Sequence, residues 1–264
     1  MSADPELPRS VVVERDGPVM IITINRPDRR NAVDRETASG LFNAFRHFDA
    51  DQTASAAVLT GAGDTFCAGA DLQAIAAGDP NEVTTPSPRD ITDTPAPMGP
   101  TRLRLSKPVI AAIEGHAVAG GLELAAWADL RVMADDAVVG VFCRRWGVPL
   151  IDGGTVRLPR LIGHGRAMDL ILTGRAVGAA EAAEMGLVSR VVPPGAARAA
   201  AVSWALELAR MPQECLRIDR ASVLSQWGLT ESTAIAGEVT EAVGLLTGGS
   251  VRAGAARFRP AADS

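Results

Sequence analysis

Three glycine-rich segments of this 264-residue chain each follow an apolar run, and there the backbone can approach a ligand closely. They lie at residues 61–72, 115–125 and 146–155. A single segment of this kind is also typical of an ordinary strand-to-helix turn. None has the GxGxxG or GxxxxGKS/T spacing, so the sequence does not indicate phosphate binding of the Rossmann or P-loop type.

Glu123 is the acidic residue best placed for chemistry. It lies three residues past Gly120, where a helix is predicted to begin, so its side chain would project from the first turn. A carboxylate at that position either transfers protons or only stabilises the free N–H groups of the helix start. The negative charge also suits the positive end of the helix dipole.

The histidines and cysteines indicate neither nucleophilic catalysis nor a metal site. The three histidines have no serine or cysteine in a nucleophile-elbow context nearby. The cysteines are odd in number, widely spaced and without metal-ligand spacing, so we expect no disulfide framework and no metal. These residues are His47, His116, His164, Cys67, Cys143 and Cys215.

The elements that position these residues begin with a strand pair at residues 11–14 and 19–25, joined by a tight turn at Asp16-Gly17. A helix is predicted at residues 34–48, with Asp34 as its N-cap, and a strand at 56–60. This alternation predicts a parallel sheet. Further strands are expected at residues 109–113, 130–133 and 138–142.

Residues 74–100 are polar and proline-rich, which favours a mobile surface loop. After residue 163 the chain is rich in alanine and leucine between glycine and proline breaks, which predicts a helical last third. The predicted helices cover residues 166–172, 179–185, 197–211, 231–246 and 250–258.

Composition restricts the function classes. The chain is 47% hydrophobic and 22% charged, with a net charge of -5 and no tyrosine, which disfavours nucleic acid as a partner. No apolar run is long enough to span a membrane, and the first residues lack the apolar run of a signal peptide. We therefore expect a cytoplasmic protein without a membrane partner.

Four ordered segments resemble the enoyl-CoA hydratase/isomerase (crotonase) superfamily. They are NRPDRRNAV at 25–33, TFCAGADL at 65–72, SKPVIAAIEGHAVAGGLELAAWADLRV at 106–132 and LTGRAVGAAEAAEMGLVSRVVP at 172–193. The resemblance implies an α/β fold, a crotonase-like spiral of ββα units followed by a C-terminal helical trimerisation region. We expect the spiral core with the acyl-CoA site at residues 1–195 and the oligomerisation region at 196–264.

The resemblance also implies the site. The backbone N–H groups of Ala70 and Gly120 match the family's two oxyanion donors, which bind the thioester oxygen and are fixed before negative charge develops on it. Glu123 matches a catalytic carboxylate of the hydratases. Family contacts to coenzyme A would come from Arg29 and Arg30. The other residues expected to contact coenzyme A are Ala68, Ala70, Asp71 and Leu72.

One position departs from the hydratase pattern. The alignment places Cys143 where hydratases carry a second glutamate, and a thiol is a poor substitute for a carboxylate in activating water. Asp152, one residue out of register with a catalytic aspartate of some isomerases and dehalogenases, could supply the second carboxylate. It could equally cap a helix starting at Gly153 or Gly154.

The sequence therefore predicts an enzyme of fatty acid metabolism, a lyase or isomerase that hydrates an enoyl-CoA or moves its double bond. Coenzyme A arrives with the substrate and no other cofactor is expected. A homotrimer or dimer of trimers is implied by the resemblance. The alternatives are other crotonase chemistry on a CoA thioester, of the dehalogenase or hydrolase kind, and a non-catalytic acyl-CoA- or RNA-binding homologue.

Overall fold

The structure is a computed structural model that describes residues 7–85, 87–89, 91–247 and 249–256. The chain divides into two compact units, Met1–Leu208 and Ala209–Ser264. None of the helices in the described residues is both long enough and apolar enough to cross a membrane.

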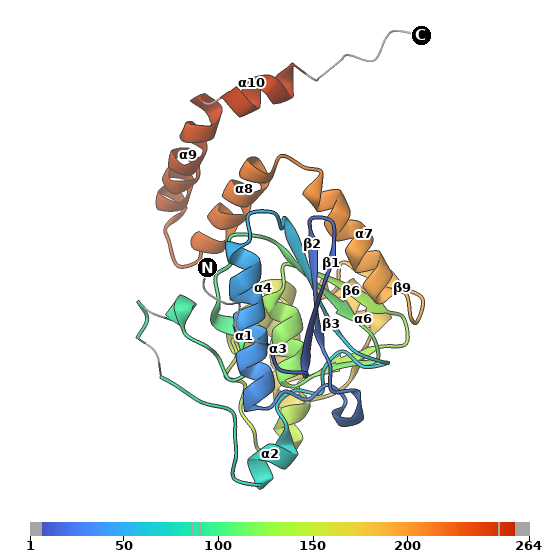
Figure 1. Cartoon of the computed structure of the whole chain (residues 1–264). Helices are drawn as coiled ribbons and strands as arrows, with labels where there is room; N and C mark the ends of the chain where they lie inside the picture. The colour runs from blue at the N-terminus through green and yellow to red at the C-terminus, as the bar shows by residue number, and fades with distance from the viewer. Residues whose placement is uncertain (1–6, 86, 90, 248, 257–264) are drawn as a thin grey trace. The chain divides into compact units, whose positions relative to one another are not determined.

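A six-stranded sheet in the order β1-β2-β3-β4-β6-β9 forms the first unit's centre (Figure 1). Strands β1 and β2 form the predicted antiparallel hairpin through Gly17, and all other neighbours are parallel. A smaller sheet has the order β5-β7-β8. The strands are β1 (Val11–Asp16), β2 (Val19–Ile24), β3 (Ala56–Gly61), β4 (Val109–Ile113), β5 (His116–Val118), β6 (Leu130–Ala134), β7 (Val138–Gly140), β8 (Val177–Gly178) and β9 (Arg190–Val192).

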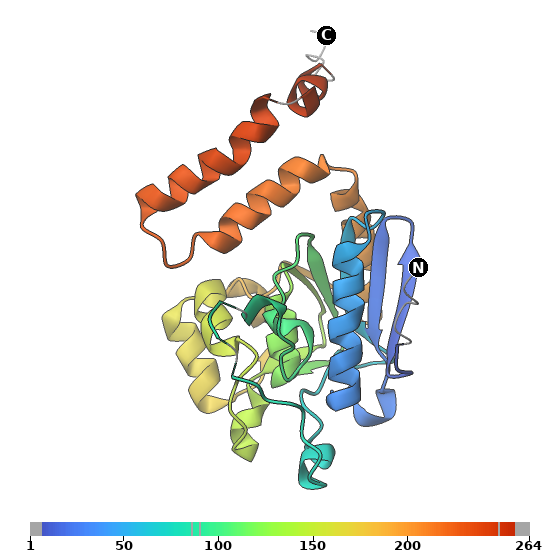
Figure 2. The ribbon, with the colours of Figure 1, turned by 60° about the vertical axis from the view of Figure 1, so that its left-hand side comes forward.

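Helices surround these sheets in the first unit, and the described residues of the second unit form three further helices (Figure 2). The first unit holds α1 (Arg35–Ala50), α2 (Leu72–Ala76), α3 (Gly120–Trp127), α4 (Gly154–Ile162), α5 (His164–Thr173), α6 (Ala179–Glu184) and nearly all of α7 (Ala197–Ala209). The second holds α8 (Gln213–Ser225), α9 (Glu231–Thr247) and α10 (Gly249–Ala255).

The large sheet is buried on both faces because each face packs against other elements, and neighbouring residues of each strand point to opposite sides. On one side, Ile22 and Leu59 belong to the same core as Phe45 of α1. On the other, Ile21 and Val58 lie in a second core with three alanines of α7. These alanines are Ala197, Ala201 and Ala205. The first compact unit, which ends at Leu208, therefore includes nearly all of α7.

Helix α1 begins as the sequence predicts. Asp34 is its N-cap, and Asp34 Oδ1 accepts hydrogen bonds from Thr37 N at 2.9 Å and Thr37 Oγ1 at 2.6 Å. At the other end, Lys107 Nζ donates to Phe48 O and Asp51 O, which satisfies carbonyls that the helix leaves without partners.

Two expectations require correction. The strand expected at residues 138–142 ends at Gly140, because its partner β5 ends at Val118, and Phe142–Trp146 forms a 3-10 helix. Helix α8 was not expected from the sequence. The helix expected at 250–258 is α10, and residues 257 and 258 lie outside the described residues.

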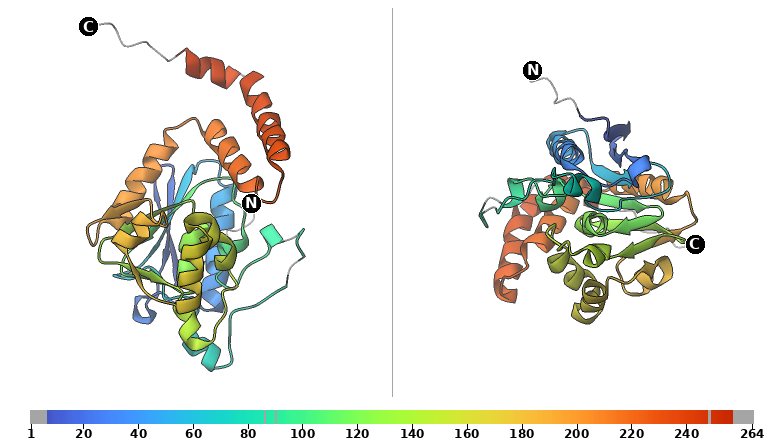
Figure 3. Two further views of the ribbon diagram at one scale, coloured as in Figure 1. Left: turned by 180° about the vertical axis from the view of Figure 1, so that it is seen from behind. Right: turned by 90° about the horizontal axis from the view of Figure 1, so that it is seen from below.

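Most of the described residues of the polar segment at residues 74–100 lie on the outside of the first unit (Figures 1 and 3), but residues 96–100 are buried. They are anchored more firmly than their composition suggests. Asn81 Nδ2 donates to Val33 O at 3.0 Å and to Pro97 O at 2.7 Å. Arg102 Nη1 donates to Thr84 Oγ1 at 3.1 Å.

Candidate active site

Two glycine-containing turns meet beside the small sheet. Cys67 pairs with Ala117 of β5 in a parallel bridge, in which Cys67 N donates to His116 O at 2.9 Å and Val118 N donates to Cys67 O at 3.0 Å. Ala70 and Gly120 each lie three residues beyond this pair. A Cβ atom on Gly69, whose φ is +97°, would lie 3.0 Å from Gly120 N. The bridge thus brings the two predicted donor segments together.

The direction of the Ala70 N–H is set by the peptide group that it shares with Gly69. Gly69 O accepts a hydrogen bond from Val33 N at 2.8 Å. In a trans peptide the N–H points opposite to the carbonyl, so the Ala70 N–H points away from Val33. Among the residues that the structure describes, it donates to no acceptor.

The Gly120 N–H is oriented in the same way. Ala119 O accepts hydrogen bonds from Leu122 N at 3.0 Å and Glu123 N at 3.3 Å, inside the first turn of α3. The Gly120 N–H therefore points out of the helix start, and it has no acceptor in the described part of the chain. Ala119 makes this turn with φ 54° and ψ -125°. Such backbone costs a non-glycine residue on the order of 1–3 kcal/mol.

Glu123 projects from the first turn of α3 and is buried, with 3% exposure. Its Oε1 accepts hydrogen bonds from Asp152 N at 2.9 Å and Gly154 N at 2.8 Å. It thus stabilises the start of α4. Glu123 Oε2 has no hydrogen-bond partner within the described residues, so one oxygen is fixed and the other is available to a substrate.

The environment of Glu123 favours its protonated form. Burial raises the pKa of Glu123 from 4.5 to about 7, and the negative charge of Asp152 contributes to the same shift. The hydrogen bonds from Gly154 and Asp152 act in the opposite direction. A carboxyl group with a pKa near neutrality can both accept and return a proton under physiological conditions.

Asp152 is buried to a similar degree, but its carboxylate faces another segment. Asp152 Oδ1 accepts hydrogen bonds from Met98 N at 2.9 Å and Thr101 Oγ1 at 2.6 Å. Burial raises its pKa. The N-cap of α4 is Gly153, without a side-chain cap, so the alternative that Asp152 caps this helix is wrong. The carboxylate instead holds residues 98–101 near the site.

Two further residues, which the sequence did not single out, support this arrangement. Arg157 Nη1 donates to Asp152 O at 2.8 Å, and Arg157 Nη2 donates to Thr101 O. A Cβ on Gly120 would meet Met98 Sδ at 2.6 Å, so the Met98 side chain covers the turn at Gly120. Except for the Arg157–Asp152 bond, these contacts join residues more than twenty positions apart. No local sequence pattern could therefore indicate them.

Cys143 lies in the 3-10 helix after β7 and is 7% exposed. Burial raises the pKa of its thiol, and so does the charge of Glu123. The thiol is therefore neutral near pH 7.

The residues expected to contact coenzyme A form two neighbouring segments. Ala68 N donates to Arg30 O at 3.0 Å, which joins residues 29–30 to residues 68–72. The Arg29, Arg30 and Leu72 side chains are exposed. Asp71 is buried, and its carboxylate binds Arg26 and the N–H groups of Gln73 and Ala74. Asp71 thus has internal partners.

This α/β fold brings two adjoining turns together, each with a main-chain N–H group that has no acceptor in the described residues, and Glu123 and Asp152 are buried carboxyl groups beyond the second turn. Main-chain donors of this kind are typical of enzymes that stabilise an oxyanion. The family model for enoyl-CoA hydratase/isomerase matches residues 14–260. The chain belongs to this family, also called the crotonase superfamily. The predicted family and the crotonase-like α/β fold are confirmed, and the trimer stays a prediction. As a member it is an acyl-CoA-processing enzyme.

Individual relatives agree. Enoyl-CoA hydratase EchA19 of Mycobacterium tuberculosis is 42% identical over 205 residues, 75% of this chain and 72% of the relative. A mevalonyl-coenzyme A hydratase of Beauveria bassiana is 35% identical over 231 residues, 85% of this chain and 82% of the relative. The crystal structure of enoyl-CoA hydratase EchA1 from Mycobacterium marinum has a TM-score of 0.85 at 34% identity, covering 94% of this chain and 95% of that one.

Proposed function

We propose that this enzyme binds an enoyl-CoA thioester with its carbonyl oxygen between the N–H groups of Ala70 and Gly120, and that Glu123 moves the proton. The observation that carries this proposal is the pair of unpaired N–H groups whose directions are fixed by their own peptide carbonyls. Such donors need no rearrangement when negative charge forms on the oxygen. Removing one donor of this kind costs on the order of 100-fold to 1,000-fold in turnover in other enzymes.

Cys143 favours transfer of a proton between carbons. Glu123 would take a proton from one carbon next to the double-bond system, the two N–H groups would hold the resulting dienolate oxygen, and Glu123 would return a proton to the other carbon. The protons and electrons balance without another reactant. Hydration requires a group that activates water and another that protonates the α-carbon, and a neutral thiol performs neither well.

Hydration is the second candidate, and the names of several relatives favour it, enoyl-CoA hydratase EchA19 among them. In this case Asp152 is the second carboxylate. Its raised pKa and its position beside Glu123 are compatible with an acid role, although its Oδ1 already accepts two hydrogen bonds. Both reactions move only protons and water, so we propose that neither needs a metal or redox cofactor.

The test uses a 2-enoyl-CoA and a 3-enoyl-CoA in heavy water, with α-proton exchange, double-bond position and water addition followed separately. We expect Glu123→Gln to lose nearly all α-proton exchange yet still bind the ester, because the amide keeps the shape but accepts no proton.

Asp152→Asn should lower the rate on the order of 100-fold to 10,000-fold only if Asp152 transfers a proton. Full exchange by Glu123→Gln would refute the assignment, and unchanged Asp152→Asn would leave Glu123 acting alone.

We also propose a cytoplasmic homotrimer or dimer of trimers whose exposed Arg29 and Arg30 meet the phosphates of coenzyme A. Arginine suits phosphates because its guanidinium makes paired hydrogen bonds. The helices after residue 208 support assembly. Four apolar residues of α9 at helical spacing are exposed, namely Ile235 53%, Val239 56%, Val243 48% and Leu246 64%.

A further inference from the structure

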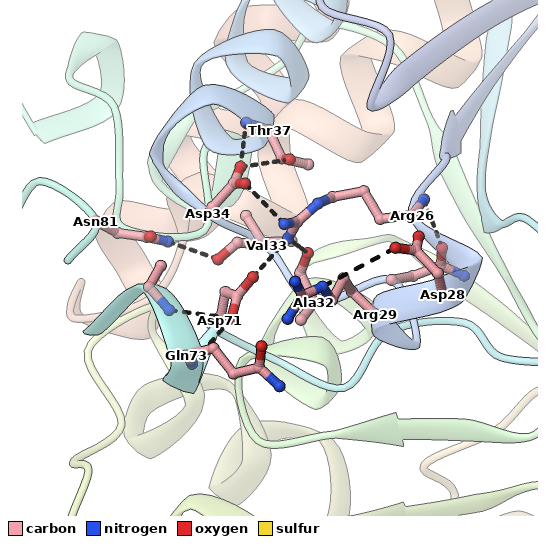
Figure 4. A network of polar contacts seen from close by, with 12 residues as sticks. Arg26, Asp28, Arg29, Ala32, Val33, Asp34, Thr37, Asp71, Gln73 and Asn81 are labelled. Atoms are coloured by element: carbon pink, nitrogen blue, oxygen red, sulfur yellow. Dashed lines mark hydrogen bonds and ion pairs between the residues drawn. The ribbon is translucent and has the colours of Figure 1, made fainter. Parts of the chain in front are cut away.

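Arg26 lies at the centre of a polar network that includes Asp71, the residue after the proposed donor Ala70 (Figure 4). Its Nη1 donates to Asp71 Oδ2 at 2.9 Å and to Ala32 O at 2.5 Å, and its Nη2 is 2.9 Å from Asp34 Oδ2. The Arg26 side chain is 17% exposed. One guanidinium therefore joins the segment before α1 to the segment before α2.

These two segments form the ladder that aims the Ala70 N–H. Val33 N donates to Gly69 O at 2.8 Å, and Asp71 N donates to Val33 O at 2.9 Å. Val33 thus holds the peptide groups on both sides of Ala70. Arg26 binds the residues on either side of Val33 and also Asp71. The guanidinium consequently fixes both sides of the ladder at once.

The carboxylate partners are themselves fixed. Asp71 Oδ1 accepts hydrogen bonds from Gln73 N at 3.0 Å and Ala74 N at 3.2 Å, which leaves Oδ2 for Arg26. Asp34 divides its oxygens in the same way between Thr37 and Arg26. Each carboxylate therefore ties Arg26 to the start of a helix, and the guanidinium has little freedom to shift.

We propose that Arg26 is a positioning residue for the reaction, which holds the Ala70 N–H in its direction toward the thioester oxygen by bracing the Val33–Gly69 ladder. This inference rests on the proposed function of Ala70. Arg26 acts through the backbone and does not contact the substrate. Its loss should lower kcat more than it raises KM, because a misdirected donor weakens the interaction with the developing oxyanion most.

The test compares wild type with Arg26→Met combined with Asp71→Asn, so that the carboxylate of Asp71 is not left buried without its partner. The asparagine amide would still accept the helix-start hydrogen bonds through its oxygen. Isotope-edited infrared spectroscopy of bound butyryl-CoA reports the polarisation of the thioester carbonyl. We expect a smaller carbonyl shift than in wild type and a kcat lowered on the order of 10-fold to 100-fold, with KM changed much less.

Arg175→Met is the matched control. Arg175 also binds two carboxylates, Asp169 and Glu181, but within the described residues it makes no hydrogen bond or ion pair with the donor turns. This variant should keep the wild-type carbonyl shift. Arg26→Lys, which keeps the charge but not the fork, should fall between the two and serves if the double variant does not fold.

The role of Arg26 would be overturned if the double variant had the same carbonyl shift and kcat as wild type. If the double variant does not fold, the same result with Arg26→Lys would overturn it. The absence of any carbonyl shift in wild type would instead refute the oxyanion role of Ala70. The two failures are therefore distinguishable.

Discussion

Glu123 uses its two oxygens for different purposes. Oε1 accepts hydrogen bonds from the N–H groups of Asp152 and Gly154 and so holds the start of α4 against α3. The same bonds prevent the carboxyl group from rotating. The proposed base is therefore held in one orientation by two N–H groups, and α4 would otherwise leave that of Gly154 without a partner.

The raised pKa of Glu123 predicts opposite pH dependences of stability and activity. Because the folded pKa of about 7 exceeds the ordinary 4.5, the folded state binds the proton more tightly than the unfolded state. The stability of wild type should fall relative to Glu123→Gln as the pH rises through this window, by roughly 3 kcal/mol in full. Wild-type kcat/KM should rise with a midpoint near pH 7, because the base must be ionised.

Urea unfolding of wild type and Glu123→Gln between about pH 4 and pH 9 measures the difference between their free energies of unfolding. Parallel stability curves would show that the pKa of Glu123 is not raised.

At this scale the sequence could indicate Glu123, because it stands at a predicted helix start. It could not indicate that Oε1 is bound by residues 29 and 31 positions away.

At the scale of elements, the contact between α3 and the start of α4 has no spare space. A Cβ on Gly154 would lie 2.9 Å from both Cγ and Oε1 of Glu123. We expect Gly154→Ala to displace the carboxyl group and to lower turnover on the order of 100-fold, because small misplacements of reacting groups are that costly. Steady-state kinetics with the preferred enoyl-CoA measures this.

Gly165→Ala is the control, because a Cβ at this position of α5 meets nothing within 4 Å. Alanine there should raise the free energy of unfolding by about 0.5–1 kcal/mol and leave turnover unchanged. A fully active Gly154→Ala enzyme would contradict the tight contact.

The sequence predicted the elements whose signals are local. The β1–β2 hairpin has its glycine turn, and α1 has its aspartate cap. Helix α4 was harder to predict, because Pro159 lies inside it and its first N–H group, that of Gly154, binds Glu123 from a distant helix. The strand after Val138 was predicted too long for a related reason, since its length depends on a partner strand that the pattern does not reveal.

At the scale of the whole molecule, α9 predicts assembly. Val239 lies in the middle of its exposed apolar stripe. We expect wild type to have the mass of three or six chains by light scattering, and Val239→Glu to dissociate, because burying a charge at an apolar interface is costly. Glu241→Ala, about 200° around the helix from Val239, should keep the wild-type mass. A monomeric wild type would contradict the proposed trimer.

The part of the site that could be predicted is the part that lies in the four segments that resemble the family. They supplied Ala70, Gly120 and Glu123, and the parallel bridge at Cys67 explains why segments about fifty residues apart meet. They did not supply the bracing by Arg26. That bracing depends on side-chain contacts with Asp34 and Asp71, which only the folded chain brings together.

Both proposed donors belong to the main chain, and this shapes how such a protein can diverge. No side-chain replacement except proline deletes a backbone N–H, so random mutation seldom erases the anion cradle directly. The proposed proton carrier Glu123 and the neighbouring residues Cys143 and Asp152 are ordinary side chains and are open to exchange. A lineage built on this chain can therefore acquire a different reaction by changing a few codons and still inherit the means to stabilise an enolate.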